Sequence, residues 1–237
     1  MFQQAVPTLQ TLQPLQIMKS KRTVPINAHQ GFTLIELLVV ITIIAILASL
    51  VMSQATKMMA DARKLQVQTV IKDLRIAITS YQLEYNRYPV NPSLLSSASS
   101  GADVPAIMTD ENTGIVSALL SASSSGSSGG SSSSTNLNPK DIKFIELPIA
   151  KNGKFGLVNA QPPYKLVDLW GTPYYVLLDT NGDKQVMNPD LNNSDPTISQ
   201  NATSPPPKNL PTEVAVYSWG LDMKPTTKDD VVSWRSK

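Results

Sequence analysis

Residues 32–52, FTLIELLVVITIIAILASLVM, decide the fold because they are almost continuously apolar and carry a single charge, on Glu36. As an α-helix this stretch would span roughly 30 Å, the thickness of the hydrocarbon core of a bilayer. Three basic residues precede it and predict that its N-terminal side stays in the cytoplasm: Lys19, Lys21 and Arg22. An ordinary secretory signal is the alternative, but its apolar core is expected to be shorter and to end at a small-x-small site.

Glu36 is the informative residue of this stretch. A carboxylate in an apolar helix costs about 2–3 kcal/mol at the bilayer centre and less near the helix end. Such residues usually have a functional partner, although a glutamate near the interface can also reach the headgroups or be protonated. Its neighbours favour the first interpretation.

Residues 31–36, GFTLIE, resemble the class III signal of type IV pilins and pseudopilins, in which a glycine precedes Phe-Thr-Leu-Ile-Glu and an apolar helix. The resemblance implies that a prepilin peptidase cleaves between Gly31 and Phe32 and that the new amino terminus is methylated. Residues 1–31 would then be a leader, with Met18 as the expected true start. Residues 32–52 would remain as a transmembrane and filament-core helix, with Glu36 acting in assembly.

The helical pattern continues beyond the apolar stretch. No Gly or Pro interrupts residues 32–88, which predicts one helix roughly 85 Å long that ends before Pro89. Apolar residues at four-three spacing form a stripe that should pack on a sheet, with a coiled coil as the alternative: Val67, Ile71, Leu74, Ile78, Tyr81 and Tyr85.

The remainder, within a soluble head over residues 53–237, reads as short strands and loops. Residues 96–135 are rich in Ser and Gly and predict a flexible insertion, with a short helix near residues 110–120. The strands are expected at residues 143–147, 174–178, 184–187 and, as the last one, 213–218. Asn181-Gly182 predicts a hairpin between the second and third strands, and residues 188–212 predict a long loop.

Two later strings resemble the major pseudopilin of type II secretion systems. Residues 168–174, DLWGTPY, resemble its Asp-Pro-Trp-Gly-x-Pro-Tyr turn, and residues 218–234 resemble its C-terminal calcium loop. The second resemblance implies calcium ligands at Asp222 and Asp230, with Ser218 as a further candidate. Residues 179–183, DTNGD, are a competing calcium candidate, but they lack the downstream glutamate of an EF-hand, and a plain hairpin explains them.

The amino-acid composition argues against several kinds of catalytic chemistry. The chain has no cysteine and one histidine, His29, which would leave with the leader. Thiolate and imidazole chemistry are therefore absent from the mature chain, and the sequence predicts no enzyme and no catalytic residue. The net charge of +2 does not favour a nucleic-acid partner.

Together these features predict an α+β, pilin-like fold: a long N-terminal helix, transmembrane in its first half, packed on a small antiparallel β-sheet. The resemblance implies a structural subunit of a type II secretion pseudopilus or related filament, supporting protein secretion. Its expected partners are copies of itself, related pilins, the prepilin peptidase, the inner-membrane assembly platform and lipid. It would cross the inner membrane once, with the head in the periplasm or outside. A single-pass, membrane-anchored binding protein of the cell envelope is the alternative.

Overall fold

The computed structural model describes residues 31–96, 101–121, 136–201 and 203–235. The chain divides into two compact units, one up to Val51 and one from Met52 onward. One helix, α1, runs from Leu34 to Tyr85 and belongs to both. The expected leader, except for Gly31, and residues 97–100 and 122–135 of the Ser/Gly-rich stretch lie outside the described residues.

The part of α1 in the first unit has the length and composition of a membrane span. Its mean hydropathy over an 18-residue window reaches 2.9, and none of that window is buried within the protein. Its apolar side chains are exposed all round, from Leu34 at 84% to Val51 at 68%. A helix that is apolar on every side requires an apolar environment, such as lipid or other helices.

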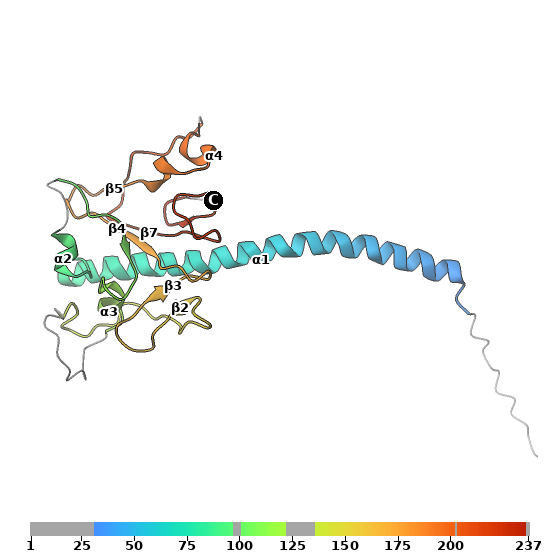
Figure 1. Ribbon diagram of the computed structural model, residues 1–237, viewed down its shortest axis with the longest axis horizontal. Coiled ribbons are helices and arrows are strands. Elements are labelled where there is room, and N and C mark those ends of the chain that lie inside the picture. The colour runs from blue at the N-terminus through green and yellow to red at the C-terminus, as the bar shows by residue number, and fades with distance from the viewer. Residues whose placement is uncertain (1–30, 97–100, 122–135, 202, 236–237) are drawn as a thin grey trace, which may run out of the picture. The chain divides into compact units, whose positions relative to one another are not determined.

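The part of α1 in the second unit packs on the head by its predicted stripe. Val67, Ile71, Leu74, Ile78 and Tyr81 are completely buried and belong to the main core. The stripe is therefore used inside the subunit, which contradicts the coiled-coil alternative. Figure 1 shows this part of α1 running alongside β4 and β7.

The helix ends three residues earlier than expected. Asn86 has a left-handed backbone, with φ of 51°, and its N–H donates to the Gln82 carbonyl at 2.7 Å. Asparagine tolerates this conformation better than most residues. Asn86 therefore ends the helix three residues before Pro89.

The head is built on one four-stranded antiparallel sheet of order β1–β4–β7–β8. These strands comprise Ile107–Met108, Tyr175–Leu178, Val214–Ser218 and Val231–Val232. The central pair aligns Val176 with Val216, and β8 joins β7 through Tyr217 and Val232. The predicted strand at residues 213–218 is thus confirmed as β7, but it is not the last, because β8 follows it.

Both faces of this sheet are buried, because successive side chains of a strand point to opposite sides. Val176, Leu178, Val214 and Val216 face the core that contains α1. The other face forms a second cluster: Tyr175, Leu177, Ala215, Tyr217 and Val232, joined by Val186 and Leu210. The last two come from β5 (Val186–Met187) and β6 (Asn209–Leu210), which pair with each other.

The predicted hairpin between β4 and β5 is wrong. The Asp179 carboxylate accepts hydrogen bonds from the backbone N–H groups of Gly182 and Lys184, each at 2.7 Å. This turn carries the chain out of the main sheet, and β5 pairs with β6 instead of β4. The expected long loop at residues 188–212 contains, besides β6, the 3-10 helix η1 (Pro189–Asn192) and α4 (Pro196–Ser199).

The predicted strand at residues 143–147 is also wrong. The N–H groups of Phe144 and Ile145 both donate to the Leu119 carbonyl, at 2.9 and 3.3 Å, so this segment closes the end of a helix. That helix, α3 (Ile115–Leu119), confirms the short helix expected near residues 110–120.

The prediction of one flexible insertion over residues 96–135 is wrong for residues 101–121. They hold β1 and α3, with Val104, Ile107, Ile115 and Leu119 buried in the main core. Residues 97–100 and 122–135 lie outside the described residues.

The remaining small elements are α2 (Pro92–Leu95) and the antiparallel pair β2 (Gly156–Leu157) and β3 (Leu166–Val167). A long N-terminal helix with small antiparallel sheets confirms the α+β, pilin-like class.

Candidate functional site

The predicted processing and assembly residues lie at the start of α1. The Thr33 hydroxyl and backbone N–H both donate to the Glu36 Oε2 atom, at 2.7 and 2.8 Å. In return, the Glu36 N–H donates to the Thr33 hydroxyl at 3.3 Å. This reciprocal arrangement is a capping box, which satisfies N–H groups that a helix start leaves unpaired. Glu36 therefore has a local role in the subunit, and sequence reasoning missed Thr33 although Thr-x-x-Glu is its signature.

The fold does not require a glycine at position 31. A Cβ added at this position would meet no atom within 4 Å, and the neighbouring Phe32 is 80% exposed. The first unit thus presents residues 31 and 32 openly, as a protease substrate must. Cleavage and methylation at this bond stay predictions.

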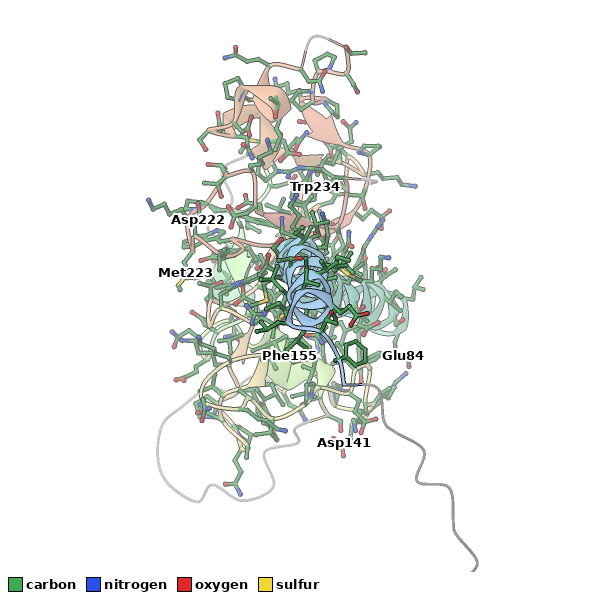
Figure 2. The ribbon with its side chains drawn as sticks, turned by 90° about the vertical axis from the view of Figure 1, so that its right-hand side faces the viewer. Glu84, Asp141, Phe155, Asp222, Met223 and Trp234 are labelled. Carbon is green, nitrogen blue, oxygen red and sulfur yellow. The ribbon has the colours of Figure 1, made fainter. Side chains whose placement is uncertain are left out.

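The second candidate site is the loop between β7 and β8. The Thr227 hydroxyl oxygen lies 3.3 Å from Asp222 Oδ1, 2.9 Å from Asp229 Oδ1 and 3.2 Å from Asp230 Oδ1. Its single proton can be donated to only one of these three carboxylates at a time. Asp222 and Asp230 thus share Thr227 as a neighbour with Asp229, and their role as metal ligands stays a prediction. Asp222 lies next to Met223 in this loop (Figure 2).

Two cations lie near these carboxylates, and both also pair elsewhere: Arg235 lowers the pKa of Asp230 and pairs with Asp190. Lys228, which is adjacent in sequence, pairs with Asp195 at 3.1 Å. Burial raises the pKa of Asp230 to about 7, although hydrogen bonds from Thr227 act in the opposite direction. Three converging carboxylates with one shared hydroxyl are the hard oxygen donors that calcium prefers. Among the described residues, these three carboxylates are not a group whose ligand atoms all lie within 4.8 Å of one another, so calcium binding here stays a prediction.

Ser218 lies in a different network. Its hydroxyl donates to Asp168 Oδ2 at 2.5 Å and accepts the Gly220 N–H at 3.2 Å. Asp168 is completely buried and also accepts the backbone N–H groups of Trp170, Gly171 and Thr172. Ser218 thus ties the turn at residues 168–174 to the end of β7, and its place among calcium ligands stays a prediction.

Gly220 sets the path of the calcium-candidate loop. Its φ is +75°, and an added Cβ would lie 2.4 Å from the Asp229 carbonyl oxygen. Only glycine permits this approach of the two loop ends, which brings Asp229 beside the Asp222 N–H at 3.0 Å.

The competing candidate at residues 179–183 gains a third carboxylate from a distant segment. Carboxylate oxygens of Asp103, Asp179 and Asp183 lie within 4.8 Å of one another. However, Asp103 accepts the N–H groups of Thr180 and Asn181, and Asp179 accepts two others in its turn. Asp183 accepts the Gln185 N–H, so backbone donors stabilise all three of these charges. The same holds for Asp222, Asp229 and Asp230, so backbone donors do not distinguish the two candidates.

The comparisons with known proteins agree with the N-terminal geometry. The prokaryotic N-terminal methylation motif matches residues 26–52. Type II secretion system core protein G of Klebsiella michiganensis is 37% identical over 82 residues, which cover 33% of this chain and 56% of that protein. The Escherichia coli protein of the same name is 34% identical over 89 residues, covering 36% and 59%.

A type IV major pilin protein, PilE1 of Neisseria gonorrhoeae, is 30% identical over 97 residues, covering 40% of this chain and 54% of the pilin. The chain thus spans between half and three fifths of the length of these relatives. No solved structure matches the chain significantly.

The methylation motif ends where the apolar part of α1 ends, and the capping box lies inside it. By this motif and these similarities, the chain resembles the type IV pilins and the type II secretion pseudopilins in its N-terminal part.

Proposed function

We propose that this protein is a structural subunit of a pilus-like filament, most similar to a secretion pseudopilus, and that it has no catalytic role. The observation that carries the proposal is the order Gly31, Phe32, capping box and a helix long and apolar enough to span a membrane. Cleavage after Gly31 would leave α1 in the mature chain, so the same helix could first anchor the subunit in the inner membrane and then pack in a filament core.

Processing is tested on the membrane fraction of cells that produce the full chain. We expect Edman sequencing or intact-mass analysis to find Phe32 as the methylated first residue. Gly31→Ala should slow cleavage less than Gly31→Leu, because the peptidase must accommodate this side chain beside the cut bond. A first residue near position 50 would identify a secretory signal and contradict the filament proposal.

Glu36 is proposed to stabilise the register of subunits in the filament. Cleavage creates an amino group on Phe32, and a carboxylate in a low-dielectric setting can offset this charge on a neighbouring subunit. This role is separable from capping, because glutamine also serves at the third position of a capping box. Glu36→Gln removes the charge and keeps the cap, whereas Thr33→Ala removes the cap and keeps the charge.

We therefore expect Glu36→Gln to be cleaved normally but to lose filaments in sheared-fraction immunoblots. Thr33→Ala should retain filaments, at a cost of about 1 kcal/mol in local helix stability. If the two variants behave in the opposite way, capping is the main role of Glu36. If Glu36→Gln assembles normally, the charge pairing is dispensable.

A calcium ion held by Asp222, Asp229 and Asp230 would complete the head. Bound calcium would supply positive charge to three carboxylates and so stabilise the β7–β8 loop by mass action. We expect the detergent-solubilised chain to melt at a higher temperature in millimolar calcium than in chelator. Asp222→Ala and Asp230→Ala should each abolish this gain, and Asp183→Ala should preserve it. Equal melting temperatures with calcium and chelator would refute the site.

A further inference from the structure

The chain contains two Asn-Gly pairs in exposed turns of the head, Asn152-Gly153 and Asn181-Gly182. The two glycines have similar φ values of +70° and +81°, and a Cβ added at either would meet no atom within 4 Å. In an Asn-Gly pair the backbone nitrogen can attack the preceding side-chain amide, because glycine has no side chain to obstruct the approach. Both pairs allow this chemistry, so their surroundings decide where it occurs.

At the first pair, both reacting groups are free. The backbone groups of Lys151 and Lys154 exchange two hydrogen bonds, each at 3.1 Å, and enclose a two-residue turn in which Asn152 has a φ of 53°. Within the described part of the chain, neither the Asn152 side-chain amide nor the Gly153 N–H has a hydrogen-bond partner. These two groups therefore lose no hydrogen bond of their own when they approach each other.

At the second pair, both reacting groups are held. The Gly182 N–H donates to Asp179 Oδ1 at 2.7 Å, and Asn181 Oδ1 accepts the Asp183 N–H at 2.8 Å. Hydrogen bonds to a charged acceptor are stronger than those between neutral groups. Attack of the Gly182 nitrogen on the Asn181 side chain must first break both bonds, which raises its barrier.

The charges around the two pairs are opposite in sign. Because the attacking nitrogen must give up its proton, nearby cations favour the reaction and nearby carboxylates oppose it. Lys151 and Lys154 flank the first pair on either side. Beside the second pair, carboxylate oxygens of Asp103, Asp179 and Asp183 lie within 4.8 Å of one another. Electrostatics and hydrogen bonding thus favour the same pair.

We propose that Asn152-Gly153 is a site of spontaneous covalent modification, from which the fold protects Asn181-Gly182. The Gly153 nitrogen forms a bond to Asn152 Cγ, the Cγ–Nδ2 bond breaks, and the amide nitrogen leaves as ammonia with the proton that the Gly153 nitrogen gives up. Water then opens the succinimide ring at either carbonyl and leaves aspartate or isoaspartate at position 152. The reaction needs water alone and requires neither leader cleavage nor filament assembly.

The product would change a basic and apolar surface of the head. Lys151, Lys154 and Arg63 line a groove of about 710 Å³ that no carboxylate lines. Ile149 and Met223 line the same groove and are 54% and 51% exposed. Each modified chain gains one carboxylate between the two lysines, so the positive charge at this surface falls as the protein ages.

The test follows both pairs in the same sample. Detergent-solubilised full-length chain is incubated at mildly alkaline pH, in buffer and in concentrated urea, and samples are taken over time. Chymotryptic peptides that contain each pair are then analysed by mass spectrometry for conversion of the amide to the acid. Methyl transfer specific for isoaspartate confirms the ring-opened product.

In buffer, we expect Asn152 to convert about tenfold faster than Asn181, which corresponds to about 1.4 kcal/mol in activation free energy. In urea the two pairs should convert at similar rates, because the hydrogen bonds and charges that the fold places around them are gone. Replacing both flanking lysines, by Lys151→Gln and Lys154→Gln, should slow conversion of Asn152 about threefold in buffer. Lys208→Gln, on a distant exposed lysine, should leave the rate unchanged.

Equal rates of the two pairs in buffer would overturn the proposal, as would an Asn152 that stays unconverted. A tenfold ratio that persists in urea would also overturn it, since the neighbouring sequence and not the fold would then set the difference. An unchanged rate in the double lysine variant would refute the part assigned to charge.

Discussion

Asp168 shows how much of the head depends on one buried carboxylate. It accepts three backbone N–H groups and the hydroxyls of Thr172 and Ser218. Asp168→Ala would leave these donors without a partner in the core, and each buried unpaired donor costs about 1–3 kcal/mol. We expect the variant to lose at least about 3 kcal/mol of unfolding free energy, measured by denaturant titration of the detergent-solubilised chain.

The control for this prediction is Asp183→Ala. Asp183 is exposed and accepts one backbone N–H, from Gln185, so its loss should change the unfolding free energy by less than about 0.5 kcal/mol. A loss at Asp168 no larger than that at Asp183 would contradict the role assigned to the buried network.

Single residues also mark the limit of what the sequence predicts. Asp222 and Asp230 were predicted as ligands from resemblance, and both lie beside the Thr227 hydroxyl because eight residues allow the loop to return. Asp229 and Thr227 carry no local signal that separates them from other polar loop residues. Thr33 did carry such a signal, the Thr-x-x-Glu pattern of a capping box, but only Glu36 was predicted to have a role.

At the scale of elements, the β7–β8 loop depends on Gly220. Gly220→Ala imposes a left-handed backbone on alanine and drives its Cβ into the Asp229 carbonyl. We expect a loss of more than about 2 kcal/mol in unfolding free energy and loss of any calcium response. Both are measured by thermal melts with calcium and with chelator.

Gly182→Ala is the matched control for the loop. Gly182 has a similar φ of +81°, but an added Cβ would meet no atom within 4 Å. Its substitution should cost only the backbone strain, about 1–2 kcal/mol, and should keep the calcium response. If both variants behave alike, contact with Asp229 is not what requires glycine at position 220.

Helices and strands were predictable where the spacing of their apolar residues matched the face that they bury. The stripe of α1 and the runs of β4 and β7 repeat apolar residues at the period of the structure they form. Residues 143–147 have the same local character, but the unpaired carbonyl of Leu119 at the end of α3 recruits their N–H groups. A local pattern of five residues cannot reveal hydrogen bonds to a distant segment of this kind.

At the scale of the whole molecule, buried and half-buried tyrosines predict the pH above which the fold loses stability. Burial raises the pKa of Tyr88, Tyr175 and Tyr217 to about 12, from about 10 in the unfolded chain. The unfolded state therefore loses these protons first. Stability should not depend on these groups below pH 10 and should fall as the pH rises from 10 to 12.

This prediction is checked with denaturation midpoints at pH 8, 10 and 11, together with tyrosinate absorbance. Tyr217→Phe should reduce the slope above pH 10, because one titrating group is removed. A midpoint that is equal at pH 8 and pH 11 would contradict the burial-driven shifts.

Topology was the part of the fold that the sequence did not predict. The only strand pairing predicted was a hairpin between residues 174–178 and 184–187, whereas the sheet places β1 beside β4 and brings β7 between β4 and β8. Strand order depends on which apolar faces can be covered at the same time. Here β5 and β6 leave the sheet to cover its second face.

The distance in sequence between α1 and the segments that cover it has a consequence for biogenesis. Arg75 on α1 bonds Thr212, which is made 137 residues later, and the buried stripe of α1 shares its core with β7. Until β7 is made, earlier segments such as residues 104–119 can cover only part of this stripe, and folds rich in such remote contacts form slowly. Membrane targeting of α1 therefore has time to occur before the head closes, and a newly made subunit needs shelter from aggregation while it waits.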